Sequence, residues 1–261
     1  MITVLVSGAA GRMGSEVVRA VLAEDDLELV AAVDPAHSGQ PVGEGTTLSY
    51  ESDLASAIEA TRPQVMVDFT HPSVVGGTIA TALAHGVHCV VGTTGLPIAE
   101  LEALASNARD GACLFMAPNF AIGAVLMMRF AAEAARFMPH VEIIELHHDR
   151  KADAPSGTAL RTASLIADAR TTVPAAPGRE TEIAEGARGA LVENVTIHSV
   201  RLPGLVAHQE VLFGGQGQTL SIRHDSIDRT SFMPGVVLAI RNVVHHTGLV
   251  IGLERFMGEQ G

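Results

Sequence analysis

Aromatic residues and lysine are scarce in this chain. Its 261 residues include no tryptophan and one tyrosine, Tyr50, and aromatic residues make up 3% of the total. The hydrophobic fraction is nevertheless 47%, so we expect cores built from Ala, Val, Leu, Ile and Met. Lys151 is the only lysine among 17 Lys and Arg residues. A single lysine in such a chain suggests a position that needs a compact point charge and a possible proton donor. The planar guanidinium group of Arg supplies neither.

Clustered cations, paired cysteines and long apolar runs are also missing. The net charge of −12 disfavours a nucleic-acid partner, because phosphate binding needs grouped Lys and Arg. Cys89 and Cys113 lie in apolar strand-like runs, which predicts buried free thiols and no disulfide framework. The first residues lack the features of a signal peptide, and no apolar run is long enough to span a membrane. We therefore expect a cytoplasmic protein with no membrane partner.

The first 116 residues alternate short apolar runs with helix-like segments. Strand-like runs cover residues 2–7, 27–33, 64–69, 87–91 and 112–116, and helices are expected near 12–23, 53–60, 73–85 and 98–109. Runs this apolar are typical of strands buried on both faces. The βαβα order predicts an α/β fold with a Rossmann-type, doubly wound parallel sheet.

The pattern changes after residue 120. Helices are expected at 122–137, 156–169 and 233–246, strands at 141–147, 195–202, 205–213 and 218–225, and a long loop at 171–190. Consecutive strands with glycine-rich turns indicate an open antiparallel or mixed sheet. We predict a dinucleotide-binding domain over residues 1–119 plus 229–261, with an inserted α+β domain over 120–228.

A glycine-rich turn follows the first predicted strand. It runs from Gly8 through Gly11, Arg12 and Met13 to Gly14, and Asp34 follows the second strand. Glycines let a backbone approach a pyrophosphate closely, and a helix N-terminus attracts it. Asp34 would accept hydrogen bonds from ribose hydroxyls. The simpler alternative is a plain turn with a surface aspartate.

Asp34 also bears on the choice of cofactor. A carboxylate repels a 2′-phosphate, and Pro35 follows it with no cation alongside, although Arg12 could partly offset the repulsion. We expect NADH to be used at least as well as NADPH. Ligands of open α/β sheets lie beyond the carboxyl ends of strands. The further cofactor-binding residues expected there are Phe69, Gly92, Thr93, Thr94, Ala117, Pro118, Asn119 and Phe120.

The stretch from Glu145 to Ala159 concentrates polar chemistry between a predicted strand and a predicted helix. His147 and His148 are adjacent, so on a strand they point to opposite faces, and no Cys or third His lies close in sequence. We expect no metal site. A solvated polar loop is one interpretation. The other is a carboxylate cradle beside a proton donor, formed by Lys151 and the helix start at residues 156–158.

This stretch resembles the E-L-H-H-x-x-K-x-D-A-P-S-G-T signature of the 4-hydroxy-tetrahydrodipicolinate reductase (dihydrodipicolinate reductase) family. The glycine turn and the loops at 92–95 and 117–123 match that family in order and spacing, as do Arg201, residues 208–210 and residues 228–232. The similarity covers essentially the whole chain. One departure is Pro35, where some members carry Arg, so recognition of a 2′-phosphate is in doubt.

The resemblance implies that NAD(P)H reduces a small cyclic imine with two carboxylates, formed by dehydration of 4-hydroxy-tetrahydrodipicolinate, to tetrahydrodipicolinate. This is a step of diaminopimelate and lysine biosynthesis. It further implies that His147 is the general acid and Lys151 its activating cation, and that the inserted domains bind substrate and pair their sheets into a homotetramer. The implied carboxylate-binding residues are His148, Ser156, Gly157, Thr158 and Arg229.

Three other functions remain open. A methyltransferase also uses a glycine turn and a ribose-binding acid, but it would not need Lys151 and a separate anion site. A nucleotide-sensing regulator would not need to retain His147 and Lys151. A related reductase acting on another imino or aldehyde acid fits most of the same residues.

Overall fold

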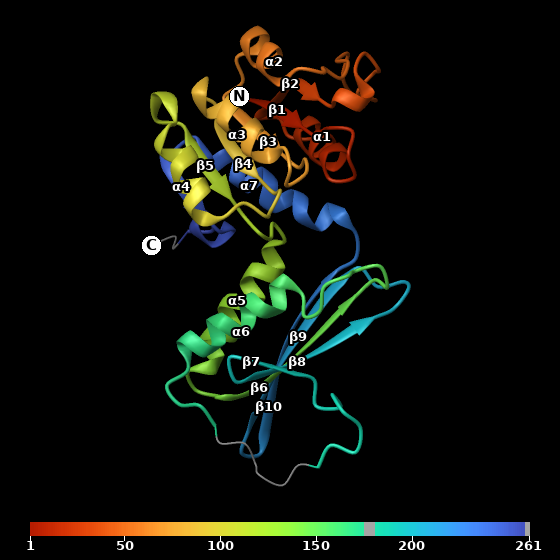
Figure 1. Cartoon of the computed structure of the whole chain (residues 1–261), viewed down its shortest axis with the longest axis vertical. Helices are drawn as coiled ribbons and strands as arrows, with labels where there is room; N and C mark the ends of the chain where they lie inside the picture. Colours follow the sequence, from red (N-terminus) through yellow and green to blue (C-terminus); the bar gives the residue numbers. More distant parts are fainter. Residues whose placement is uncertain (175–180, 259–261) are drawn as a thin grey trace. The chain divides into compact units, whose positions relative to one another are not determined.

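The computed structural model describes residues 1–174 and 181–258. The chain divides into two compact units, Met1–Ala121 with Phe232–Gly261, and Ile122–Ser231 (Figure 1). These boundaries lie a few residues after those expected from the sequence, at 119 and 228.

The first unit is built on a parallel sheet, as predicted. Its strands are β1 (Ile2–Ser7), β2 (Leu27–Val33), β3 (Val65–Asp68), β4 (His88–Val91), β5 (Cys113–Met116) and β11 (Gly248–Ile251). They lie in the order β11-β5-β4-β3-β1-β2, and each neighbouring pair is parallel. Strand β11 was not predicted, because a run of four residues is too short to show a strand pattern in the sequence. It is recognised as a strand only through its pairing with β5.

Helices cover both faces of this sheet. They are α1 (Gly14–Leu22), α2 (Leu54–Thr61), α3 (Val75–Ala84), α4 (Ile98–Ser106) and α7 (Met233–Val243). All except α2 are shorter than their predicted segments, and α2 is shifted by one residue. Helices α2, α3 and α4 share one hydrophobic cluster with the sheet, and α1 packs beside α7. The doubly wound arrangement is therefore confirmed. Helix α1 begins two residues after its predicted start, because the residues up to Met13 form the glycine turn.

The core of this unit is aliphatic, as the composition predicts. Leu5, Met66 and Leu114 are fully buried, with Phe115 the largest buried side chain. Cys89 and Cys113 are free and buried. Burial raises the pKa of the Cys113 thiol to about 11, so this thiol stays protonated and unreactive at neutral pH.

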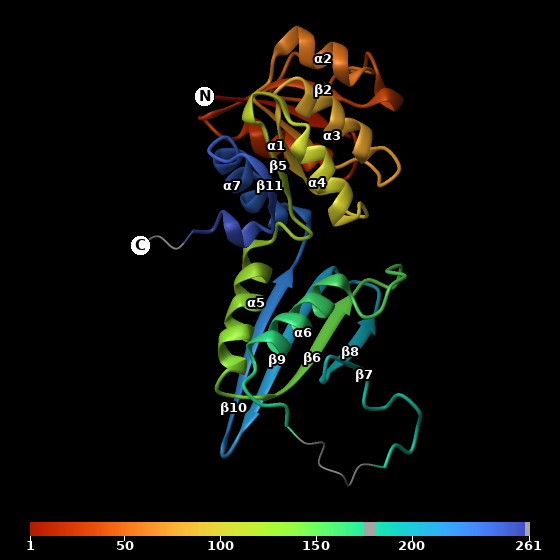
Figure 2. The ribbon, with the colours of Figure 1, turned by 60° about the vertical axis from the view of Figure 1, so that its left-hand side comes forward.

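The second unit packs two helices on a mixed sheet. Its strands are β6 (His140–His147), β7 (Ala190–Val192), β8 (Val195–Arg201), β9 (Ala207–Gly215) and β10 (Gln218–Ser226), in the order β10-β9-β6-β8-β7. β6 and β8 are parallel, and the other pairs are antiparallel. Helices α5 (Ile122–Ala135) and α6 (Gly157–Ala169) lie side by side in both views (Figures 1 and 2). Strand β7 overlaps the expected loop at 171–190, of which residues 175–180 lie outside the described residues.

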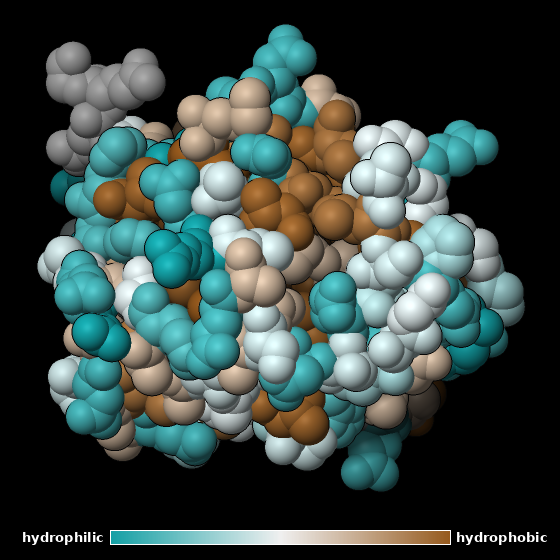
Figure 3. Space-filling model, turned by 90° about the horizontal axis from the view of Figure 1, so that it is seen from above, coloured by the Kyte–Doolittle hydropathy of each residue, from teal (hydrophilic) through white to brown (hydrophobic). Residues whose placement is uncertain are grey.

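The described residues include exposed hydrophobic side chains but no helix that could span a membrane. Across residues 1–174 and 181–258, no helix combines the length and apolar character needed to cross a bilayer. Hydrophobic side chains reach the surface in several places among hydrophilic ones (Figure 3), which is normal for folded proteins.

Candidate functional site

Four loops of the first unit begin where neighbouring parallel strands end, at the same side of the sheet. Ser7 pairs with Asp68, Asp68 with Val91, and Val91 with Met116. The next residues along the chain, Gly8, Phe69, Gly92 and Ala117, therefore lie at the same carboxyl edge. The strand order reverses between β1 and β3, which is where open α/β sheets bind their ligands. The structure thus brings together all four segments that the sequence assigned to a dinucleotide.

The glycine turn needs its glycines for steric reasons. Gly8 has a φ of 74°, and a Cβ there would lie 2.8 Å from the carbonyl oxygen of Phe69. A Cβ on Gly14 would overlap the carbonyl oxygen of Gly8. Within the described part of the chain, the amides of residues 12–14 make no hydrogen bond, and Met13 offers no capping side chain to α1. A tight turn with unused amides at a helix start fits a pyrophosphate.

Asp34 lies beside this turn, but its carboxylate is already engaged. It accepts hydrogen bonds from the backbone amides of Ala10 and Ala36, both at 3.2 Å. The ring Nδ1 of His37 lies 2.9 Å from Asp34 Oδ1. The sequence places no cation directly after Asp34, and the structure adds the His37 ring as a hydrogen-bond partner of its carboxylate. This contact was not predicted, because only the one-turn 3-10 helix Pro35–His37 brings His37 back to Asp34.

The other three loops contribute mainly backbone and apolar surface. A Cβ on Gly92 would overlap the Phe69 ring, and the Phe69 and Phe120 ring centroids lie 5.7 Å apart. Ala117 and Phe120 are 1% and 3% exposed, so their side chains pack inward. The Asn119 side chain accepts from the Ala121 amide at 2.9 Å.

Asp68 is a residue of this edge that the sequence analysis missed. Its carboxylate is fully buried. It accepts hydrogen bonds from the hydroxyls of Thr70, Thr78 and Thr93 at 2.8 to 2.9 Å, and from the Thr70 amide at 3.1 Å. These donors belong to the loop after β3, to α3 and to the loop after β4. One buried carboxyl group therefore fixes two of the four loops to each other.

A second cluster of polar residues lies at one edge of the mixed sheet. His147 ends β6 and pairs with Arg201 on β8 and with Ala207 on β9. Ala207 also pairs with Ser226, the last residue of β10. The exposed Arg229 follows three residues later, in a short 3-10 helix, Arg229–Phe232. The expected catalytic histidine and Arg229 thus leave this sheet at the same edge.

The carboxylate of Glu145 contacts the imidazole ring of His147. This side chain is 0% exposed, and its Oε2 lies 2.5 Å from His147 Nδ1. Arg201 donates to both carboxylate oxygens, at 2.8 and 3.0 Å. Burial raises the pKa of Glu145, but hydrogen bonds from His147, Arg201 and Ser199 outweigh it and lower the pKa to about 2. Neither Glu145 nor Arg201 was assigned a role from the sequence, although both lie in stretches that match the family.

The low pKa of Glu145 predicts a pH dependence of stability. Its folded value of about 2 lies below the ordinary 4.5, so the group stabilises the fold above pH 4.5 and loses that contribution as the pH falls towards 2. The shift corresponds to about 3 kcal/mol. We expect Glu145→Gln to lower the melting temperature at pH 7, by an amount that shrinks between pH 5 and 3. A difference independent of pH would contradict this.

Lys151 and His148 continue the cluster. The Lys151 ammonium lies 2.8 and 2.9 Å from the Asp153 carboxylate oxygens and is 22% exposed. This hydrogen bond lowers the pKa of Asp153. Arg201 donates to the Asp153 carbonyl at 2.6 Å, which ties this loop to Glu145. His148 Nδ1 is buried without a hydrogen-bond partner among the described residues.

The start of α6 is shaped to admit an anion. Ser156 is 2% exposed and caps the helix, because its hydroxyl oxygen accepts from the Ala159 amide at 3.2 Å. A Cβ on Gly157 would meet nothing within 4 Å, and Thr158 is half-buried. An anion could therefore approach the positive end of the helix at Gly157.

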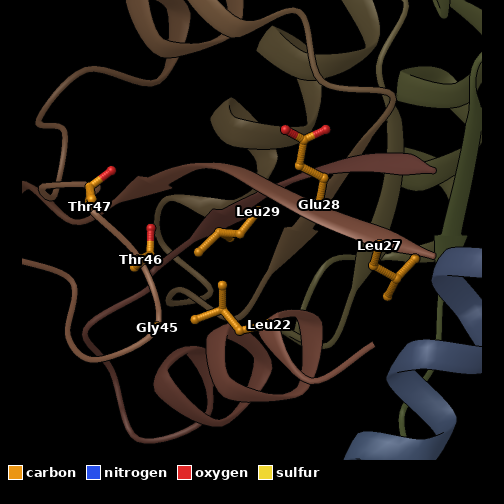
Figure 4. Close-up of a pocket in the computed structure, with 7 residues that line it drawn as sticks. All are labelled: Leu22, Leu27, Glu28, Leu29, Gly45, Thr46 and Thr47. Atoms are coloured by element: carbon orange, nitrogen blue, oxygen red, sulfur yellow. The ribbon is translucent and has the colours of Figure 1, made fainter. Parts of the chain in front are cut away.

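One pocket of the first unit lies away from these residues. Its volume is about 530 Å³, and it is lined by Leu22, Leu27, Glu28, Leu29, Gly45, Thr46 and Thr47 (Figure 4). Leu27 begins β2, whereas Asp34 follows the end of that strand. The pocket is thus at the opposite edge of the sheet and includes no predicted site residue.

Comparison with known proteins assigns the chain to a family. The model described as dihydrodipicolinate reductase, N-terminus, matches residues 2–120, and the one described as dihydrodipicolinate reductase, C-terminus, matches residues 123–257. The chain belongs to the dihydrodipicolinate reductase family. The family implies a pyridine nucleotide cofactor, which fits the unused amides and the glycine turn of the first unit.

Individual relatives agree along nearly the whole chain. The 4-hydroxy-tetrahydrodipicolinate reductase of Syntrophomonas wolfei is 51% identical, covering 97% of this chain and 98% of that protein. The reductase of the same name from Listeria welshimeri is 52% identical, covering 97% and 99%. A solved structure, dipicolinate-bound dihydrodipicolinate reductase from Paenisporosarcina sp. TG-14, is 45% identical with a TM-score of 0.87, covering 98% and 99%.

Proposed function

We propose that the chain reduces the cyclic imine formed by dehydration of 4-hydroxy-tetrahydrodipicolinate to tetrahydrodipicolinate, in diaminopimelate and lysine biosynthesis. The observation that carries this proposal is His147, held by Glu145 at the same sheet edge as Arg201, with Lys151 in the loop that follows. The chain belongs to a family whose relatives bear the name of this reaction. A proton donor and anion-binding groups are what reduction of a dicarboxylate imine requires.

The first unit binds the reduced dinucleotide, which supplies the hydride when bound. The turn from Gly8 to Gly14 receives the pyrophosphate at the start of α1. Asp34 receives the adenosine ribose. The loops at Phe69, Gly92–Thr94 and Ala117–Phe120 surround the nicotinamide end of the dinucleotide. Small residues and backbone in these loops leave room for the nicotinamide ribose.

The second unit binds the imine and delivers the proton. Lys151 and the α6 start at Ser156, Gly157 and Thr158 bind the carboxylates, with His148 and Arg229 as further partners. Lys151 then shares its charge between Asp153 and the substrate. His147 gives a proton to the carbon next to the one that receives hydride, which suits an imidazole because it exchanges protons near neutral pH.

Cofactor preference follows from Asp34. Its carboxylate repels a 2′-phosphate, so we propose that NADH is used at least as well as NADPH. Arg12 lies within the glycine turn and can partly offset the repulsion, so NADPH is also accepted. The measurement is kcat/KM for the two cofactors at one saturating imine concentration. A ratio strongly favouring NADPH would overturn the preference.

Thr158→Val tests the carboxylate cradle. The substitution keeps the shape of the side chain and removes its hydroxyl. A hydrogen bond to a charged group contributes roughly 1.5–3 kcal/mol, so KM for the imine should rise by about tenfold or more while KM for NADH stays the same. An unchanged imine KM would remove Thr158 from the cradle.

The uncovered face of the mixed sheet favours self-association. Helices α5 and α6 cover the face that carries the buried Ile143 and Glu145, so alternate residues such as Ile144, Leu146 and Val200 point to the other side. Leu212 on that side is 36% exposed. We propose a cytoplasmic homotetramer formed by pairing these sheets. Light scattering should give four times the 27.2 kDa chain mass, and a monomer would contradict it.

One experiment tests the proposed reaction directly. The purified protein should oxidise NADH in the presence of the freshly generated imine and not in its absence. If it oxidises NADH only with another imino or aldehyde acid, the protein is still a reductase but the proposed substrate is wrong. If S-adenosylmethionine rather than NADH raises the melting temperature, the dinucleotide assignment also fails.

A further inference from the structure

The environment of His147 determines which of its ring nitrogens can release a proton. Nδ1 lies 2.5 Å from Oε2 of Glu145. Since the pKa of Glu145 is about 2, this carboxylate is ionised at neutral pH and can only accept a hydrogen bond. Nδ1 must therefore carry a hydrogen and keep it. Nε2 is the nitrogen left to exchange a proton with a substrate.

The carboxylate itself is held rigidly. Arg201 donates to both of its oxygens, a two-bond geometry that fixes the plane of the carboxylate. The charged groups near the pair are Arg201 on β8 and the Lys151–Asp153 ion pair in the loop after β6. On β9 the residue paired with His147 is Ala207, which has no charge. Glu145 is thus the anion in direct contact with the imidazole.

We propose that Glu145 is the positioning residue of the proton transfer: it holds His147 in the form that releases a proton from Nε2, and its charge stabilises the protonated ring. This inference rests on the proposed function. In the step, the Nε2–H bond breaks and a C–H bond forms at the substrate carbon beside the one that receives hydride. The ring becomes neutral and retains its Nδ1 hydrogen. Glu145 stays ionised throughout, and solvent returns a proton to Nε2.

The same strand offers a matched control. Glu142 lies three residues before Glu145 on β6 and therefore points to the opposite face of the sheet. Its carboxylate contacts His198 Nε2 at 2.7 Å and Arg188 at 2.5 Å. It therefore repeats the Glu–His–Arg arrangement in residues to which we assign no part in the reaction. Its side chain is 36% exposed, against 0% for Glu145. Glu142→Gln removes a comparable charge from the same strand and leaves His147 and its partner unchanged.

The first experiment compares the pH dependence of kcat in the full-length protein, Glu145→Gln and Glu142→Gln, at saturating NADH and imine. In Glu145→Gln we expect kcat at pH 8 to fall by about tenfold or more, with partial recovery towards pH 6, so that the alkaline limb moves down by about one pH unit. The Kd for NADH should not change. Glu142→Gln should keep the original profile. A general structural defect would lower kcat equally at every pH, and that result would overturn the proposal.

The second experiment does not depend on turnover. A ring N–H held by a buried carboxylate gives a proton NMR signal far downfield of other N–H signals. The unmodified protein and Glu142→Gln should show one such signal that His147→Gln abolishes, and Glu145→Gln should lack it. A protein that shows this signal but does not oxidise NADH with the imine would refute the proposed function alone. If no downfield signal depends on His147, the proposed role of Glu145 fails, even if Glu145→Gln does not fold.

Discussion

Replacing His147 or Lys151 with alanine is expected to lower kcat by about 10²-fold or more, because general acid catalysis typically contributes 10²- to 10⁴-fold. His147→Ala removes the proposed proton donor. Lys151→Ala removes the cation that we propose to bind a substrate carboxylate. Neither residue belongs to the unit with the glycine turn, so the Kd for NADH should stay nearly unchanged.

Two further variants sharpen this test. Arg150→Ala removes the exposed cation next to Lys151 and should leave kcat close to the original value. Lys151→Arg keeps the charge but replaces a compact ammonium with a planar fork, so we expect it to recover only part of the activity. Steady-state kcat and the Kd for NADH should be measured for all four variants. Near-normal turnover in His147→Ala or Lys151→Ala would remove that residue from the mechanism.

Gly14→Ala is expected to abolish most of the dinucleotide binding. A Cβ at this position would overlap the carbonyl oxygen of Gly8, and a backbone atom cannot move aside by a change of rotamer. The turn and the first residues of α1 must shift, and the unused amides of residues 12–14 lose their arrangement. We expect the Kd for NADH to rise by on the order of 10²-fold, equal to about 2.8 kcal/mol.

Gly77→Ala is the matched control for Gly14→Ala. Gly77 lies in α3, and a Cβ there would meet nothing within 4 Å. Alanine is favoured over glycine inside a helix by up to about 1 kcal/mol, so this variant should bind NADH normally and be slightly more stable. NADH should raise the melting temperature of Gly77→Ala but not that of Gly14→Ala. An equal rise in both would show that the glycine turn does not bind the dinucleotide.

Much of this protein is determined by local patterns along its sequence. Short, fully apolar runs separated by helical segments specify a parallel sheet, because such strands must be buried on both faces. Gly8 and Gly14 mark a turn that other residues cannot adopt without clashes. The segment from His147 to Thr158 carries its chemistry in consecutive residues, so its polar character can be recognised before any fold is known.

Only the tertiary structure decided which distant residues meet. Arg201 reaches Glu145 across 56 residues of sequence because β6 and β8 pair in one particular register. Thr93 reaches Asp68 across 25 residues, and β11 exists as a strand because β5 is beside it. Strand register and helix packing set these contacts through the burial of whole faces, which no short stretch of sequence encodes. Glu145 and His147 are two residues apart on one strand, but the arginine that fixes Glu145 became visible only once the sheet had formed.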